Sequence, residues 1–237
     1  PTSQTRYYAW DFTETYQYRS PLSSHFKLVG KQVVPRGVSD DITYCWRTLP
    51  GGIISISSTL SFSNDVVAQR SLVHFDKHSP KISIRYSILV KQRAISAAEY
   101  TFLEQLRKTT EDLGTIFGPM PVTVVGNIHG IDDPSAIVLG FFSGAEVVEQ
   151  RLFVEQLDLP QELRVRHTAG ECLVDLTCYS DQPAGLRSCV DIEQLSPTTS
   201  ILISTITDDQ GFAYTFASPE CGDCRFQGGT TKRPEFW

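Results

Sequence analysis

Lys81-Ile-Ser-Ile-Arg-Tyr-Ser-Ile-Leu-Val90 is the stretch of sequence that decides the fold. Isoleucine, tyrosine and valine recur at every second position, and the positions between them are mostly polar. Successive side chains of a strand point to opposite faces, so this alternation predicts a half-buried antiparallel strand. Residues 51–60 alternate in the same way after a Pro-Gly-Gly turn, and the aromatic residues 7–12 also favour a strand.

One helix is predicted at about residues 96–113. Ser96-Ala-Ala-Glu99 forms a capping box, and apolar residues follow it at helical spacing up to Leu113. Further short strands are expected at residues 122–128, 136–142, 151–157, 172–178, 201–207 and 212–216. The expected fold is mainly β, with sandwich- or barrel-like antiparallel sheets and the helix on one face or edge, in a single domain over residues 1–237.

The composition excludes several classes of protein. The formal net charge is −6, whereas nucleic-acid and anionic-membrane surfaces need clustered Lys and Arg. No apolar run is long enough to predict a membrane-spanning helix. The single methionine is Met120 and no signal peptide is visible, so we expect a longer precursor whose targeting signal lies upstream.

The cysteines indicate the compartment. There are six, which is an even number typical of an exported protein stabilised by disulfides: Cys45, Cys172, Cys178, Cys189, Cys221 and Cys224. Two alternatives stay open. Cys221-Gly-Asp-Cys224 has the spacing of a thioredoxin-like redox site, and Cys172, Cys178, Cys221 and Cys224 offer a set of zinc ligands. The sequence does not choose the pairing.

Aromatic residues near the start of the chain are candidates for a partner-binding surface. They are Tyr7, Tyr8, Trp10, Tyr16 and Tyr18. Large aromatic side chains are enriched at interfaces, but they also dominate hydrophobic cores, so a core role is the alternative.

Signals for chemistry are weak. His74-Phe-Asp-Lys-His78 would place His74, Asp76 and His78 on one face of a strand, where two imidazoles and a carboxylate could bind a metal, although Ser79-Pro80 indicates a solvated turn. Ser143 is one position late for a nucleophile elbow. The acidic pairs at 132–133 and 208–209 lack the spacing of a calcium loop. We expect no catalytic residue and no cofactor.

Several motifs in order resemble a known family. They are Arg6-Tyr-Tyr-Ala-Trp10, Tyr44-Cys-Trp46, Arg85-Tyr-Ser-Ile-Leu-Val-Lys-Gln92, Gly126-Asn-Ile128, Val138-Leu-Gly-Phe-Phe142, Cys221-Gly-Asp-Cys-Arg225 and Gly228-Gly-Thr-Thr-Lys-Arg-Pro-Glu-Phe-Trp237. Together they resemble a family of exported Bacteroidota lipoproteins with a domain of unknown function, often encoded beside TonB-dependent outer-membrane receptors. The resemblance implies a lipid-anchoring cysteine and a small immunoglobulin-like domain upstream of these residues, and it supplies no catalytic residues.

The expected function follows from this resemblance. We expect a non-enzymatic lipoprotein of the outer membrane, at the cell surface or on the periplasmic face, which acts as the accessory or ligand-binding partner of a TonB-dependent receptor or another envelope protein. It would handle an unidentified nutrient and touch the membrane only through an upstream lipid. An exported metal-dependent hydrolase and a purely structural envelope protein are the alternatives.

Overall fold

The computed structural model describes residues 6–77, 79–112, 123–133, 136–165, 170–177, 190–196, 198–209 and 211–237. The fold is mainly β with antiparallel sheets, and 37% of the chain is strand. This confirms the predicted fold class. Within the described ranges, α1 (Ala97–Asp112) is the only helix of seven residues or more, and α2 (Pro219–Gly222) is a single turn.

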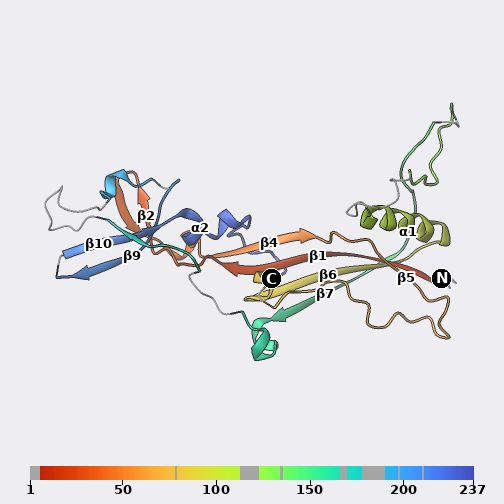
Figure 1. Cartoon of the computed structure of the whole chain (residues 1–237), viewed down its shortest axis with the longest axis horizontal. Helices are drawn as coiled ribbons and strands as arrows, with labels where there is room; N and C mark the ends of the chain where they lie inside the picture. Colours follow the sequence, from red (N-terminus) through yellow and green to blue (C-terminus); the bar gives the residue numbers. More distant parts are fainter. Residues whose placement is uncertain are drawn as a thin grey trace. The chain divides into compact units, whose positions relative to one another are not determined.

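The strands form three sheets (Figure 1). The strands are β1 (Tyr7–Arg19), β2 (Phe26–Val29), β3 (Gln32–Pro35), β4 (Tyr44–Pro50), β5 (Ser55–Ser58), β6 (Arg85–Ala94), β7 (Val147–Glu155), β8 (Asp175–Leu176), β9 (Ile201–Asp208) and β10 (Gly211–Ala217). One sheet has the order β4-β1-β6-β7, and β5 also pairs with β1. A second sheet has the order β8-β10-β9, and β2 pairs with β3.

The chain divides into two compact units. The first contains Pro1–Glu14, Pro50–His74 and Ile88–Leu152, and the second contains Thr15–Leu49, Phe75–Ser87 and Phe153–Trp237. The expectation of a single domain over residues 1–237 stays a prediction.

The core of the first unit lies between β1, β5 and α1. Ala9 of β1 pairs with Ile56 of β5, and both pack with Ile95. The helix adds Tyr100 and Leu103 to this cluster. The serine half of the predicted capping box is present, because the backbone N–H of Glu99 donates to Ser96 Oγ at 3.1 Å, while the Glu99 carboxylate pairs with Arg93. The apolar face of the helix therefore closes one side of the sheet.

The core of the second unit forms around the β9–β10 hairpin. Ile201 and Ile203 of β9 pack with Ile42, Ala217 and Cys221. Gly222 fits against β9 so closely that a Cβ atom there would lie 2.6 Å from Ile201 Cγ2. This close approach requires glycine and brings the turn of α2 onto the sheet.

The aromatic end of the chain packs only in part. The Trp237 ring meets Trp46 and Phe153 edge-on, with centroids 6.5 and 6.0 Å apart, and the guanidinium of Arg85 lies 5.2 Å from the Trp237 centroid. Phe236 is exposed. The half-buried Trp237 ring therefore joins this end to β4, β6 and β7.

Two predicted strands are not regular strands. Within residues 123–128 and 136–142, the described residues form one bridge, Val125 to Leu139. In addition, residues 80–82 form a 3-10 turn that begins at Pro80, so the strand expected from residue 81 begins at Arg85. The β2–β3 hairpin and β4 were not predicted.

Candidate functional site

Two disulfides join cysteines that are far apart in the sequence. Cys45 is bonded to Cys224 and Cys172 to Cys221, with Cα–Cα distances of 5.7 and 5.8 Å. Cys221 and Cys224 are therefore bonded to different cysteines, so in this structure they form neither a redox pair with each other nor a zinc site. The expected disulfides are confirmed for these four residues, and Cys178 and Cys189 lie outside the described residues.

The residues between and after these cysteines have a structural role. Asp223 is buried and accepts hydrogen bonds from the backbone N–H of Arg225 at 2.9 Å and from its guanidinium at 2.6 Å. The hydrogen bond to Asp223 raises the pKa of Arg225 above its usual range. The Cys-Gly-Asp-Cys-Arg motif is therefore structural: its two cysteines form two separate disulfides, and the aspartate between them is paired with the arginine.

The predicted aromatic surface is largely inside the molecule. Trp10, Tyr16 and Tyr18 are buried, and Tyr7 and Tyr8 are half-buried. The cause is the position of β1, which is an inner strand with neighbours on both sides. Tyr18 Oη donates to the Cys224 carbonyl at 2.7 Å, and burial raises the pKa of this phenol. The three buried rings are core residues and present no partner surface.

The proposed metal ligands are not on a strand. His74 and Asp76 are exposed and lie in the loop before the turn at Lys77, while His78 lies outside the described residues. Histidines, cysteines and carboxylates of the described part of the chain form no group of three that could hold a metal ion. Ser143 and the acidic pair Asp132 and Asp133 are also exposed.

Residues 123–142 of the first unit expose many large apolar side chains, and we call them the apolar segment; residues 134 and 135 are not described. Ile131, Phe142 and Ile137 are 95%, 78% and 72% exposed. The other exposed members are Val125, Ile128 and Leu139. Soluble proteins rarely leave so many large apolar side chains together in water unless they contact a partner.

Specific contacts hold the apolar segment in one conformation. The Asn127 side chain donates to the Phe142 carbonyl at 2.7 Å and accepts from the Phe142 N–H at 2.8 Å. A Cβ atom on Gly126 would lie 1.6 Å from the Gly140 carbonyl oxygen. The segment therefore has two limbs, around Gly126 and around Gly140, whose backbones are in direct contact. The Phe141 ring lies 5.3 Å from Phe102 of α1. The exposed side chains therefore stand on a fixed backbone.

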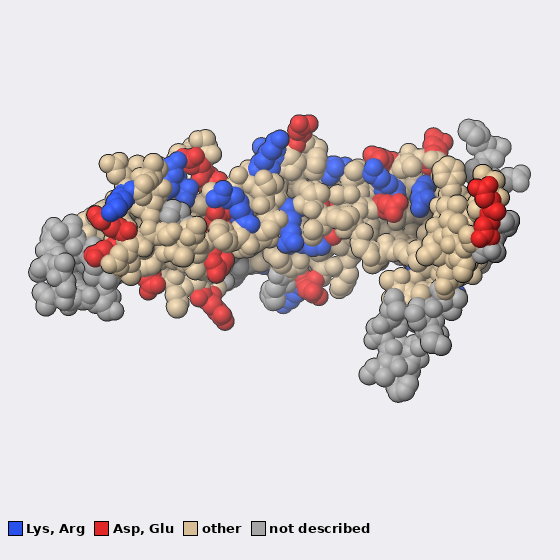
Figure 2. Space-filling view, turned by 90° about the horizontal axis from the view of Figure 1, so that it is seen from above, with Lys and Arg blue, Asp and Glu red and all other residues tan. Residues whose placement is uncertain are grey.

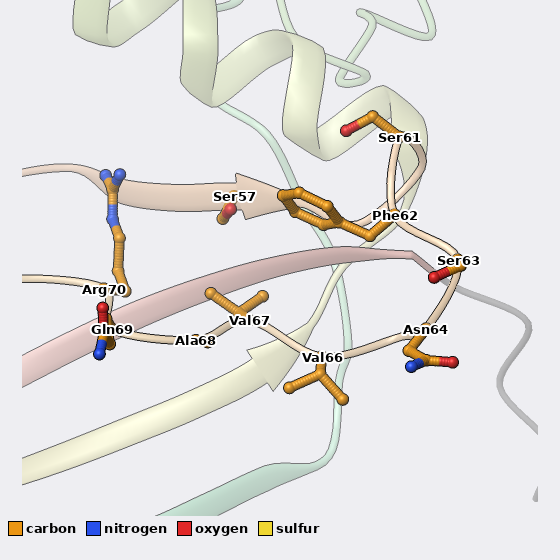
Figure 3. A pocket seen from close by; sticks show the side chains of 10 residues that line it. All are labelled: Ser57, Ser61, Phe62, Ser63, Asn64, Val66, Val67, Ala68, Gln69 and Arg70. Carbon is orange, nitrogen blue, oxygen red and sulfur yellow. The ribbon is translucent and has the colours of Figure 1, made fainter.

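The first unit also contains a groove of about 780 Å³ beside β5 (Figure 3). The loop after β5 turns back, and its returning limb forms the opposite wall. Phe62 and Val67 point into the space between the strand and this limb, and Arg70 reaches across one end (Figure 3). The lining residues are Ser57, Ser61, Phe62, Ser63, Asn64, Val66, Val67, Ala68, Gln69 and Arg70. This volume suits a small ligand.

A polar network fixes the loop that forms the groove. Arg6 donates to the carbonyls of Thr59 and Phe62, both at 2.6 Å, and to Thr59 Oγ1 at 3.1 Å. Asp65 accepts from the Thr59 hydroxyl and from Tyr8 Oη, the latter at 2.7 Å. The loop is thus bonded at Thr59 and Phe62 to Arg6, just before β1, and at Asp65 to Tyr8 of β1.

The same network shifts two pKa values. The hydrogen bonds from Thr59 and Tyr8 hold the pKa of Asp65 below its usual range, because they stabilise the carboxylate. The hydrogen bond to Asp65 raises the pKa of Tyr8, because the phenol must stay protonated to donate it. The Asp65 carboxylate is therefore ionised at neutral pH and is occupied by its hydrogen bonds to Thr59 and Tyr8.

Charges of both signs are interspersed on the face of the molecule shown in Figure 2. A mixed surface of this kind produces no broad single-sign field. The two described helices are too short or too polar for either to cross a membrane.

A family model described as a domain of unknown function (DUF4249) matches residues 1–151. The match includes the groove and the apolar segment. No curated protein and no solved structure matches the chain.

Proposed function

We propose an envelope binding function for this chain, which belongs to the family described as a domain of unknown function (DUF4249). It acts as a non-enzymatic lipoprotein of the outer membrane and as the accessory partner of a TonB-dependent receptor. The receptor and the lipid anchor come from the resemblance of its motifs to exported Bacteroidota lipoproteins. The two disulfides support the compartment, because such bonds persist outside the reducing cytosol.

The apolar segment is the observation that carries the proposal. Ile131, Ile137 and Phe142 are mostly exposed, and leaving each large apolar side chain in water costs about 1.5–3 kcal/mol relative to burial. The bonds of Asn127 keep this surface presented in one conformation, so binding a protein partner requires little further ordering. A fixed apolar surface is suited to docking a receptor.

Capture from native outer membranes tests the proposal. The full chain is used as bait beside an Ile137→Ser/Phe142→Ser variant and a Val38→Ser control, which removes an exposed apolar side chain of the second unit. We expect the wild type and the control to capture a TonB-dependent receptor, and the double variant to lose it. Equal capture by all three proteins, or no receptor in any eluate, would contradict the proposal.

A further inference from the structure

We infer that the groove beside β5 binds an acidic sugar, with the sugar carboxylate on Arg70 and the sugar hydroxyls on the neighbouring serine and amide side chains. This site is separate from the apolar segment, and its ligand class does not depend on the identity of a receptor. The inference rests on the charge, the polarity and the fixed shape of the groove.

The charge of the groove comes from Arg70. Arg70 is the only charged residue among the described residues that line the groove, and it has no ion-pair or hydrogen-bond partner among them. Asp65 is the nearest acidic residue in the sequence, but its carboxylate is bonded to Thr59 and Tyr8. An unpaired guanidinium with its donors in a fork matches a carboxylate, which it binds with two parallel hydrogen bonds.

The remaining lining suits a hydroxyl-rich molecule. Three serine hydroxyls and the side-chain amides of Asn64 and Gln69 both donate and accept hydrogen bonds. Phe62 is 54% exposed and its ring points into the groove, where the apolar C–H face of a sugar ring can pack against it (Figure 3). An aliphatic acid would engage only Arg70, and a neutral sugar only the serine and amide side chains, whereas an acidic sugar engages both.

The loop is shaped before any ligand arrives. Gln69 has a φ of 55°, in the left-handed region that non-glycine residues rarely adopt. Such conformations cluster at ligand-binding sites and persist only where the surrounding structure imposes them. The Arg6, Thr59 and Asp65 network fixes residues 59–65 of the loop, so this part of the groove wall needs little ordering on binding.

Titration calorimetry with the full chain tests this inference. The probes are trigalacturonate, the neutral galactotriose and triglutamate, which separate an acidic sugar from a neutral sugar and from an acidic peptide. We expect trigalacturonate to bind best and more weakly as salt rises, because salt screens an exposed charge. Arg70→Gln should lower its affinity about tenfold or more, the usual effect of losing a charge-assisted pair.

Lys108→Gln is the matched control, because Lys108 is an exposed cation of the first unit away from the groove lining. It should leave the affinity for trigalacturonate unchanged, and Arg70→Gln should keep the receptor capture of the wild type. Three results would overturn the inference: no binding of trigalacturonate, equal binding of galactotriose or triglutamate, or equal affinities of wild type and Arg70→Gln.

Discussion

Asn127 bonds to Phe142 through both ends of its side-chain amide, which donates to the Phe142 carbonyl at 2.7 Å and accepts from its N–H at 2.8 Å. The amide thereby replaces a strand partner between two limbs that are otherwise joined by the Val125 to Leu139 bridge. Asn127 thus adds two hydrogen bonds to the bridge and the ring contact that hold the exposed apolar side chains in place.

Asn127→Ala should loosen the apolar segment without unfolding the chain. Two exposed hydrogen bonds contribute about 1–3 kcal/mol together, so exchange of the Phe142 amide proton should accelerate roughly 5- to 150-fold. Hydrogen exchange read by NMR measures this, with Asn64→Ala as the control. Unchanged protection of Phe142 would show that other contacts hold the two limbs.

Gly222→Ala should destabilise the second unit by about 1–3 kcal/mol, the usual cost of overpacking. The added methyl group would lie 2.6 Å from Ile201 Cγ2, in a core that has no space for it. Urea unfolding measures the change. Gly52→Ala is the control, because a Cβ atom at Gly52 meets nothing within 4 Å. If the two variants are equally stable, the packing of α2 on β9 is looser than described.

Peptide mapping without reduction should recover Cys45 linked to Cys224, and Cys172 linked to Cys221. A Cys45→Ser/Cys224→Ser variant should lose about 2–5 kcal/mol of stability, because that bond closes a loop of 179 residues in the unfolded chain. A peptide in which Cys221 is linked to Cys224 would instead support the redox-pair alternative.

Acid should loosen the groove through Asp65. Its pKa is lowered in the folded state, so its contribution to stability is complete above the ordinary aspartate pKa of about 3.9 and is lost as the pH falls through the lowered value. The difference in Tm between wild type and Asp65→Asn should therefore shrink below about pH 4. The matched control is Asp132→Asn, which removes an exposed carboxylate away from the groove. A difference that persists at pH 2 would contradict this role of the carboxylate.

High pH should also weaken this network, through ionisation of Tyr8. The pKa of Tyr8 is raised in the folded state, so its contribution is complete below the ordinary tyrosine pKa of about 10 and is lost as the pH rises through the raised value. Tyr8→Phe should remove this alkaline dependence. Absorbance of the ionised phenol during a pH titration measures it, and an unshifted titration of Tyr8 would contradict the bond to Asp65.

The sequence predicts the elements whose signal is local. Strand alternation around residues 51–60 and 81–90, and the serine cap of α1, need only neighbours a few positions away. Boundaries are less local: the strand within residues 51–60 covers only Ser55–Ser58, and the strand expected from residue 81 begins at Arg85 because a turn at Pro80 competes with the same alternation.

The candidate sites could not be predicted because their contacts are distant in the sequence. Arg6 reaches Thr59 across 53 positions, and serine-rich residues 57–63 carry no ligand motif by themselves. The sequence does not show that Trp10, Tyr16 and Tyr18 are buried, because aromatic content does not distinguish an inner strand from an edge strand, and β1 is an inner one. The sequence places Gly126 and Asn127 in a strand at residues 122–128 and in a resemblance motif, and neither signal predicts their contacts with Gly140 and Phe142 in the apolar segment.

The separation of 179 residues between Cys45 and Cys224 makes this disulfide a late bond, because it cannot form until nearly the whole chain has been made. A chain made from its N-terminus contains the Cys45 thiol long before the Cys224 thiol has been added. A bond from Cys45 to another cysteine at that stage would be non-native, and thiol–disulfide exchange would have to break it before the mature pairing could form.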